Sequence, residues 1–298
     1  MIRIENISKS YGKVQAIKSL NFNVKEGQLY GLIGPDGAGK TSLFRILTTL
    51  LIPNEGKASI NNFDTVKDYK QIRNIVGYMP ERFSLYMDLS VEENLNFFAT
   101  VFNTTIEENY YLIKDIYQML EPFKKRKAGD LSGGMKQKLA LSCALIHKPK
   151  VLLLDEPTTG VDPVSRKEFW EMLKKLQGEG LTTLVSTPFL DDAELCDEVA
   201  LIQNGSILDV DTPKNIENKF PYKLWEVKSE RNYKTLQVLE KFDKKVSVFA
   251  FGNSLHLSCD VLVSKEEIMQ FLETNNIKVI DVKIIKPSIE DVFMDLMK

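Results

Sequence analysis

A glycine-rich stretch, Gly34 to Thr41, constrains this chain more than any other part of its sequence. It fits the pattern GxxxxGK(S/T), follows an apolar run and leads into residues 42–47, so strand, loop and helix are expected in that order. Glycines let such a loop wrap a phosphate group with its N–H groups pointing inward, and the positive end of the following helix adds to the attraction. Lys40 would supply a charge for the outer phosphates, and the Thr41 hydroxyl would ligate Mg²⁺. The predicted phosphate-binding residues are Gly34, Pro35, Asp36, Gly37, Ala38, Gly39, Lys40, Thr41 and Ser42.

Two acidic residues end a second apolar run, at residues 151–154. Strands that are apolar throughout are typical of buried parallel sheets, whose carboxyl ends carry the functional site. Asp155 is therefore predicted to hold Mg²⁺ through its hydration shell, and Glu156 to orient or deprotonate an attacking water. The loop and the acidic strand together predict one site that handles phosphate groups.

A third stretch lies between these two and reads Leu131, Ser132, Gly133, Gly134, Met135, Lys136, Gln137. Ser-Gly-Gly alone is common loop material. Here, however, the stretch lies between a phosphate-binding loop and an acidic strand that runs directly into Pro157 to Asp162. With these motifs, the sequence resembles the ATP-binding cassette (ABC) ATPases over about residues 1 to 220.

The resemblance implies an α/β P-loop NTPase sandwich with an inserted helical subdomain at about residues 83–149, and ATP and Mg²⁺ as ligands. It also implies a head-to-tail dimer with a second ABC ATPase subunit, identical or different. In such a dimer the stretch from Leu131 to Gln137 completes the partner's ATP site, and Asp162 lies in the loop at the dimer contact. Tyr11 is expected to stack on adenine; the alternative is a half-exposed strand tyrosine.

The sequence departs from the family pattern at two positions. Where the family has a glutamine whose amide contacts Mg²⁺ and the attacking water, this chain has Glu81, which adds negative charge beside the γ-phosphate. Where the family has a histidine that senses the γ-phosphate, this chain has Pro188, which has no polar side chain and no N–H donor. Neither His147 nor His256 lies near that position in the sequence, and His147 is expected at the surface or as a helix cap.

Composition and charge argue against several other classes. A formal net charge of −2 over 298 residues does not suggest the basic stripe that nucleic-acid binding needs, so no nucleic-acid partner is expected. Cys143, Cys196 and Cys259 show neither metal-ligand spacing nor a disulfide framework, which suits a reducing compartment. No apolar run approaches the ~18 residues that a membrane helix needs. We expect a cytoplasmic protein, peripheral on the cytoplasmic face of the cell membrane, whose partner permease subunits form the pore.

The rest of the chain predicts a second, smaller domain. Residues 72–79 look like a strand, and the polar segment from Pro213 to Pro221 looks like a boundary, so the predicted domains are 1–220 and 221–298. The second domain reads βαββαβ, the order of a ferredoxin-like α+β unit, with a hairpin turn at Gly252-Asn253. Its ending, at residues 287–293, resembles the tail of ATPases that serve drug-type and polysaccharide-type ABC exporters.

Together these features predict the ATP-binding and ATP-hydrolysing subunit of an ABC exporter. Two alternatives stay open. Glu81 and Pro188 favour a weakly hydrolysing, regulatory cassette that pairs with a consensus ATPase. A non-transport ABC ATPase is disfavoured, because such proteins usually carry two cassettes, long coiled coils or zinc ligands. The transported substrate cannot be read from this chain, since its pocket would lie in the permease.

Overall fold

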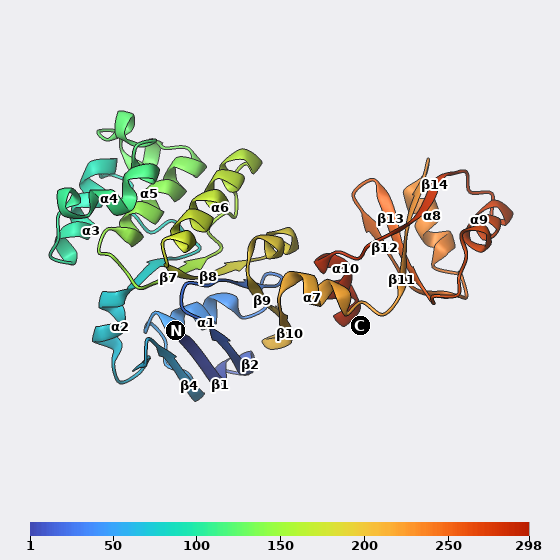
Figure 1. Cartoon of the computed structure of the whole chain (residues 1–298), viewed down its shortest axis with the longest axis horizontal. Helices are drawn as coiled ribbons and strands as arrows, with labels where there is room; N and C mark the ends of the chain where they lie inside the picture. The colour runs from blue at the N-terminus through green and yellow to red at the C-terminus, as the bar shows by residue number, and fades with distance from the viewer. Residues whose placement is uncertain (298) are drawn as a thin grey trace. The chain divides into compact units, whose positions relative to one another are not determined.

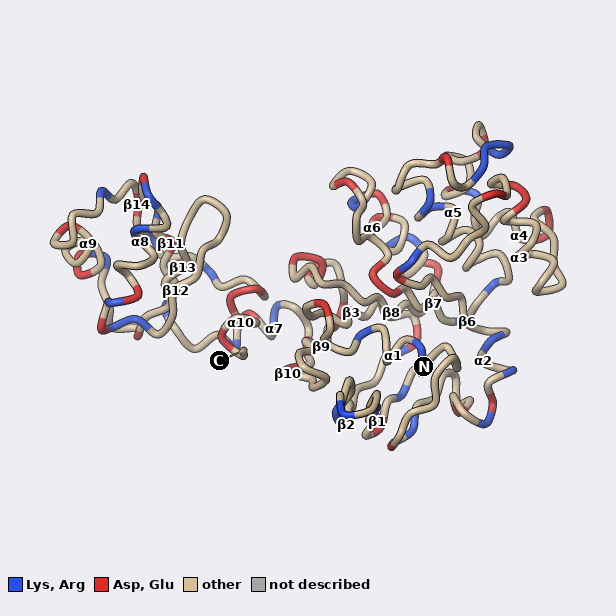
Figure 2. The backbone as a smooth tube through the Cα atoms, turned by 180° about the vertical axis from the view of Figure 1, so that it is seen from behind, with Lys and Arg blue, Asp and Glu red and all other residues tan. Residues whose placement is uncertain are grey.

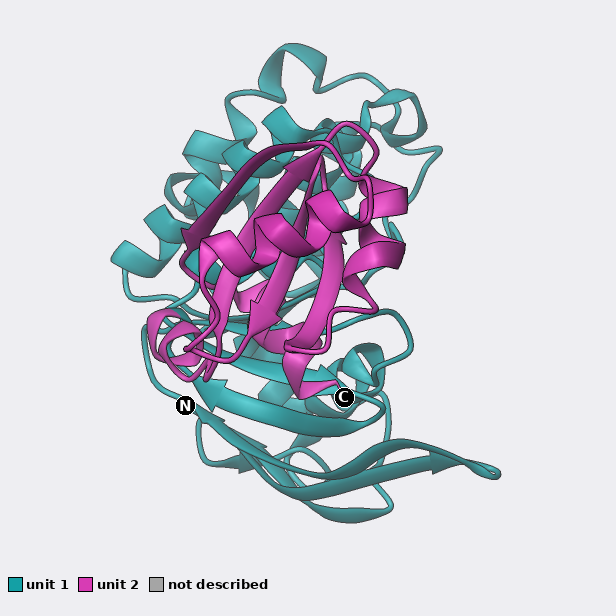
Figure 3. Ribbon diagram, turned by 90° about the vertical axis from the view of Figure 1, so that its right-hand side faces the viewer, with its two compact units in different colours: residues 1–213 teal, residues 214–298 magenta. Residues whose placement is uncertain are grey.

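The computed structural model describes residues 1–297, and the chain divides into two compact units, Met1–Pro213 and the residues from Lys214 onward (Figure 3). The sequence places the boundary after residue 220. In the structure, a short helix, α7 (Pro213–Asn218), begins at this boundary; its Ile216 is fully buried, and all of the helix after Pro213 belongs to the second unit.

A six-stranded sheet forms the centre of the first unit (Figure 1). Its order is β10-β9-β3-β8-β7-β6, and every neighbouring pair except β10–β9 is parallel. The strands are β3 (Leu29–Ile33), β6 (Val76–Met79), β7 (Val151–Asp155), β8 (Thr182–Thr187), β9 (Glu198–Gln203) and β10 (Ser206–Asp211). The two apolar runs, β3 and β7, are buried at every residue. Because parallel strands end at the same edge, the loops after β3, β6, β7 and β8 meet there.

A second, antiparallel sheet lies on the other side of helix α1 (Lys40–Leu47), which contacts β2, β4 and β7 (Figure 1). This sheet has the order β2-β1-β4-β5, with strands β1 (Ile2–Tyr11), β2 (Val14–Val24), β4 (Glu55–Ile60) and β5 (Phe63–Asp64). One apolar core joins both sheets to α1 and includes Phe22, Phe44 and Leu153. This core fixes the start of α1, and therefore the loop before it, against the central sheet.

Residues 72–79 were predicted to form one strand. In the structure they form the end of helix α2 (Tyr69–Ile75) followed by β6. Ile72 is fully buried and Ile75 packs against the core, a spacing that suits a helix. Arg73 between them instead donates from Nε to the Thr49 hydroxyl at 2.8 Å. The prediction was wrong because isoleucine and valine favour strands only weakly, and a helix with one buried face accommodates them.

Three helices form the helical part predicted at 83–149, and α5 contacts the other two (Figure 1). They are α3 (Val91–Val101), α4 (Ile106–Tyr117) and α5 (Gly133–Leu145), with 3₁₀ turns η1 (Glu121–Phe123) and η2 (Ala128–Asp130). Ser90 caps α3, because its hydroxyl accepts from Glu93 N while the Glu93 carboxylate accepts from Ser90 N. Helix α6 (Pro163–Gly178) follows β7, and η3 (Leu190–Leu195) follows β8. Among residues 1–297, no helix is both long and apolar enough to cross a membrane.

The second unit is an antiparallel sheet with its own apolar core. Its sheet order is β12-β13-β11-β14, and the chain order is the predicted βαββαβ. The elements are β11 (Lys223–Ser229), α8 (Asn232–Leu239), β12 (Lys245–Phe251), β13 (Ser254–Cys259), α9 (Lys265–Thr274), β14 (Val279–Ile285) and the additional α10 (Ile289–Leu296). Trp225, Leu257 and Leu272 belong to the core. The ferredoxin-like assignment itself stays a prediction.

Charged residues of both signs are interspersed along the backbone of both units (Figure 2). One local basic run, at residues 124–127, lies between η1 and η2. This run lies in a connection between two turns and does not continue along a helix or strand.

Candidate functional site

The loop between β3 and α1 is tightly packed against its neighbours, and two glycines make this possible. A Cβ on Gly34 would lie 2.0 Å from the carbonyl oxygen of Ile202, and one on Gly39 would lie 2.4 Å from that of Ala16. Gly39 also has a φ of 105°, in the left-handed region, directly before Lys40 begins α1. Glycine at positions 34 and 39 therefore has a steric reason, since a larger residue at either position would push the loop away from β9 or β2.

Lys40 connects this loop to the acidic strand. Its side chain is 3% exposed, and its Nζ donates to the carbonyl oxygens of Gly34 at 2.7 Å and Pro35 at 3.0 Å. The same Nζ lies 3.0 Å from Glu156 Oε1. An ammonium group has three N–H donors, so these three oxygens use all of them. The structure thus brings together the lysine and the acid that the sequence assigned to one site.

Glu156 adopts an unusual backbone conformation, with a φ of 50°. Such a conformation costs a non-glycine residue about 1–3 kcal/mol and persists only where the surroundings enforce it. Its N–H is within hydrogen-bonding distance of both the Ser186 carbonyl, at 3.1 Å, and the Ser186 hydroxyl, at 3.0 Å. Its second carboxylate oxygen accepts from the Thr159 hydroxyl at 3.1 Å. These contacts hold the carboxylate toward Lys40.

Asp155 is fully buried at the end of β7. Its Oδ1 accepts a hydrogen bond from the Ser186 hydroxyl at 2.6 Å, whereas its Oδ2 is buried and has no hydrogen-bond partner among residues 1–297. Burial raises the pKa of Asp155, and the hydroxyls of Ser186 and Thr41 oppose that rise. Asp155 lines one cavity with Thr41 and has an unpartnered carboxylate oxygen, which fits Mg²⁺, a hard cation that takes oxygen ligands.

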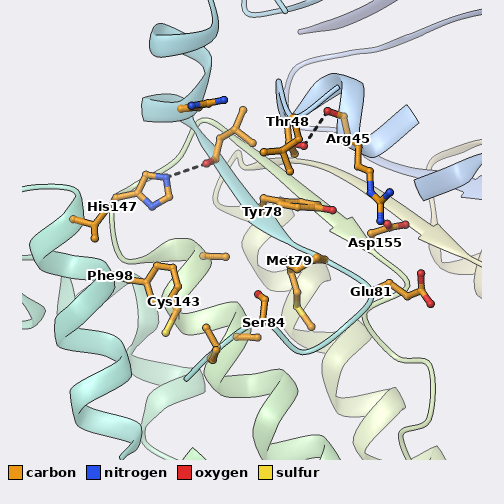
Figure 4. A pocket seen from close by; sticks show the side chains of 18 of the residues that line it. Arg45, Thr48, Tyr78, Met79, Glu81, Ser84, Phe98, Cys143, His147 and Asp155 are labelled. Carbon is orange, nitrogen blue, oxygen red and sulfur yellow. Dashed lines mark hydrogen bonds between the residues drawn. The ribbon is translucent and has the colours of Figure 1, made fainter. Parts of the chain in front are cut away.

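A cavity of about 840 Å³ opens beside Asp155 (Figure 4). At one end Glu81 and Arg45 lie near Asp155, and Glu81 is exposed. Glu81 occupies the place that its motif position implies, next to the expected metal site, and its negative charge adds to the rise in the pKa of Asp155. A carboxylate therefore faces the region where the family pattern has a neutral amide.

His147, expected at the surface or as a helix cap, lies at the other end of the cavity and is only partly exposed. Its ring is half-buried and stacks on Phe102 with the ring centres 3.8 Å apart, and its Nε2 lies 3.1 Å from the Val76 carbonyl. Burial lowers the pKa of His147. The residue lines the cavity together with Phe98 and Cys143 (Figure 4).

Pro188 directly follows β8 and offers no donor to a phosphate group. Its neighbours are held by a buried acid: the Thr187 hydroxyl donates to Asp192 Oδ2 at 2.7 Å, and Arg166 donates to Asp192 Oδ1 from Nη2 at 2.7 Å and from Nε at 3.2 Å. The Arg166 guanidinium also lies 4.0 Å from the centre of the Phe189 ring. The loop is thus braced through α6 and η3.

The stretch from Leu131 to Gln137 forms the start of α5. Leu131 is buried, while Ser132 and Gly133 are exposed, and the Ser132 hydroxyl caps the helix by accepting from Met135 N at 3.3 Å. Gly134 is buried against α6, since a Cβ there would lie 2.5 Å from the Ser165 hydroxyl. The exposed Ser132 and Gly133 are available to a partner molecule.

Asp162 and Tyr11 complete the predicted set. Asp162 caps α6, with its Oδ1 accepting from Val164 N at 3.1 Å and Ser165 N at 3.0 Å, and these bonds lower its pKa. Tyr11 is 45% exposed, and its hydroxyl lies 3.4 Å from the Ser42 hydroxyl, which places the ring beside the phosphate-binding loop.

Sequence reasoning missed Ser186, Thr159 and Arg45. Ser186 lies within a strand, where its side chain could not be assigned to a partner without the register between β7 and β8, which pairs it with Asp155. Arg45 lies one turn into α1 and shows no motif of its own. A signal was available for Thr159 alone, because it is close to Glu156 in the sequence.

Comparisons with known proteins indicate the family of this chain. The family described as "ABC transporter" matches residues 17–159. The probable multidrug ABC transporter ATP-binding protein YbhF of Escherichia coli (strain K12) is 40% identical over 95% of this chain, which spans only 49% of that relative. The Nod factor export ATP-binding protein I of Burkholderia lata is 39% identical over 68% of both chains. The chain thus spans about half the length of the first of these curated relatives.

Solved structures give the same fold. The ATP-binding cassette MJ0796, solved as a dimer in a post-hydrolysis state bound to ADP and Pi, matches 71% of this chain and 98% of its own, with a TM-score of 0.64 and 28% identity. An ATP-binding subunit of an ABC transporter matches 74% of this chain and 93% of its own, with a TM-score of 0.67 and 27% identity.

Proposed function

This chain belongs to the family of ABC transporter ATP-binding proteins, and we propose that it hydrolyses MgATP to drive a separate membrane permease. The meeting of Lys40, Asp155 and Glu156 at the ends of β3 and β7 carries this proposal. The loop N–H groups and Lys40 would bind the phosphates, and the Glu156 carboxylate would orient the attacking water and accept its proton. Thr41 and Asp155 would supply oxygen ligands to Mg²⁺, which when bound neutralises charge on the phosphoryl oxygens.

A head-to-tail dimer would complete the site. The exposed Ser132 and Gly133 at the start of α5 support this, because a helix N-terminus with exposed N–H groups attracts a phosphate from another subunit. The MJ0796 cassette was solved as a dimer. ATP bound between two such surfaces would couple nucleotide occupancy to closure of the subunits.

The permease would dock on the helical part and the neighbouring cavity, on the cytoplasmic face of the membrane. Two exposed aromatic residues, Tyr86 and Phe97, make an edge-to-face contact there with ring centres 4.8 Å apart. Exposed aromatic residues are typical anchors of protein interfaces. Export as the direction rests on the tail at residues 287–293 and on relatives described as multidrug and Nod factor export proteins.

A second candidate, a slowly hydrolysing regulatory cassette, is favoured by Glu81 and Pro188. A carboxylate at 81 disfavours charge build-up on the transferred phosphoryl oxygens, and Pro188 supplies no donor to them. In that case the chain would pair with a consensus cassette, lend it the start of α5 and keep a slow site of its own.

Phosphate release by the purified chain with MgATP tests the proposal, with a Glu156→Gln variant as background. Release above that background supports hydrolysis. ATP binding without release, and rapid release only after a second cassette encoded nearby is added, would support the regulatory candidate. Absence of any ATP binding would overturn both.

A further inference from the structure

We propose that the buried hydroxyl of Ser186 positions both acids of the site at once. It would orient Asp155 toward the metal and hold the backbone of Glu156 in its strained conformation. This inference rests on the proposed hydrolysis of MgATP. Ser186 is not assigned any role by the motifs, because it lies on β8, one strand away from the residues it contacts.

The contact is a consequence of strand register. Ser186 pairs with Asp155 across the parallel β7–β8 ladder, and both residues are 0% exposed. The Ser186 hydroxyl donates to Asp155 Oδ1 at 2.6 Å and accepts from Glu156 N at 3.0 Å. A serine hydroxyl has one donor and can accept as well, so one oxygen atom bridges two consecutive acidic residues.

The first effect concerns Asp155. A hydroxyl that donates to an ionised carboxylate makes a short, strong hydrogen bond, which fits the 2.6 Å distance. Rotation of an aspartate carboxylate about its last torsion is otherwise broad. With Oδ1 engaged, the carboxylate keeps Oδ2, which has no partner among residues 1–297, turned away from Ser186 and available as a metal ligand.

The second effect concerns Glu156. Its left-handed conformation, with a φ of 50°, is held by an N–H shared between the carbonyl and the hydroxyl of Ser186. Removing the hydroxyl leaves the bond to the carbonyl in place, so the strand pairing survives while the restraint on Glu156 weakens. The Glu156 carboxylate, now 3.0 Å from Lys40, would then sample a wider range of positions.

Strand β8 offers a matched control. Thr183 is also 0% exposed, and its hydroxyl has no hydrogen-bond partner in the described residues. Thr183→Val and Ser186→Ala therefore each remove one buried hydroxyl from the same strand, but only the second removes a contact with the acids. A general effect of losing a hydroxyl in β8 would appear in both variants.

The experiment compares wild type, Ser186→Ala, Ser186→Cys and Thr183→Val. Binding of Mn²⁺ in the presence of a non-hydrolysable ATP analogue is measured by electron paramagnetic resonance, and kcat and KM for MgATP by phosphate release. Because partners of metal ligands typically contribute 10–100-fold, Ser186→Ala should weaken Mn²⁺ binding about tenfold and lower kcat about tenfold. Analogue binding without metal should not change. Ser186→Cys keeps the shape of the side chain with a somewhat larger atom and a weaker donor, so its losses should fall between those of Ser186→Ala and wild type. It decides the question if Ser186→Ala does not fold.

Two results would overturn the inference. One is a Ser186→Ala variant that matches Thr183→Val in both Mn²⁺ binding and kcat. The other is an equal loss of analogue affinity without metal, which would indicate a general distortion of the loop. If wild type binds the analogue but releases no phosphate, the proposed hydrolysis fails, and the Mn²⁺ measurement still decides the role of Ser186.

Discussion

The ends of β3 and β7 differ from the ends of β6 and β8 in how firmly their side chains are held. Lys40, Asp155 and Glu156 are at most 7% exposed, and each is fixed by hydrogen bonds from neighbouring elements. Glu81 is exposed, and Pro188 brings no polar side chain at all. One sheet edge therefore combines a firmly held centre (Lys40, Asp155 and Glu156), proposed to bind phosphate and position the acids, with a flank (Glu81 and Pro188) that departs from the family pattern. Substitutions in the centre should abolish ATP binding or ATP hydrolysis, whereas substitutions in the flank should change only the rate of hydrolysis.

Glu156→Gln should give the largest effect and so tests the centre directly. Glutamine keeps the shape and can still accept from Lys40, but it cannot accept a proton from water, so turnover should fall roughly 10²-fold or more. ATP affinity should stay as it is, and the ATP-bound dimer should accumulate. Phosphate release and size-exclusion chromatography with ATP measure the two outcomes. Hydrolysis at the parent rate would show that the proton acceptor lies elsewhere.

Lys40→Ala should give the second-largest effect, a loss of affinity for MgATP. The change removes a charge-assisted contact to the phosphates worth ~1.5–3 kcal/mol, which corresponds to a loss of about 10- to 150-fold in affinity for MgATP. Equilibrium titration with a fluorescent ATP analogue measures it. Lys150→Ala, at an exposed lysine just before β7, is the control and should bind like the parent. Unchanged affinity in Lys40→Ala would remove this lysine from the site.

The flank is tested by restoring the family residues with Glu81→Gln and Pro188→His. A neutral amide and a phosphate donor should each favour charge build-up in the transition state, so the double variant should hydrolyse ATP about tenfold faster than the parent. Phosphate release by the purified chain measures it. If the parent alone hydrolyses ATP fast and neither change increases the rate, Glu81 and Pro188 do not slow hydrolysis, and the proposed difference between centre and flank is wrong.

The smallest effect should come from the second unit. Ser288 caps α10 and makes a capping box with Asp291, and its Oγ accepts from Asp291 N at 3.3 Å. Ser288→Ala should lower the free energy of unfolding by about 1 kcal/mol, the typical contribution of such a cap. Urea denaturation measures the loss, and phosphate release should not change. A loss of hydrolysis comparable to that of Glu156→Gln would show that the second unit takes part in the site.

Local patterns predicted much of the fold, and they failed where a contact between distant segments decided the outcome. The cap at Ser90 was predictable because both of its partners lie within one turn of the helix. Residues 72–75 were misread as strand, because burial of Ile72 in the core, and not its propensity, made this segment helical. His147 was misplaced for a similar reason, since Phe102 and Val76 reach it from other elements.

The sequence by itself determined the chemistry of the site: a loop whose glycines permit close packing, a lysine at the start of a helix and two acids at the end of a buried strand. These are local requirements, because each depends on the order of neighbouring residues along the chain. Only the tertiary structure decided that Lys40 meets Glu156 and that Ser186 bridges the two acids. The register of a parallel sheet is set by how whole strands and helices pack. Contacts between neighbouring strands therefore cannot be read from any fixed spacing of residues along the sequence.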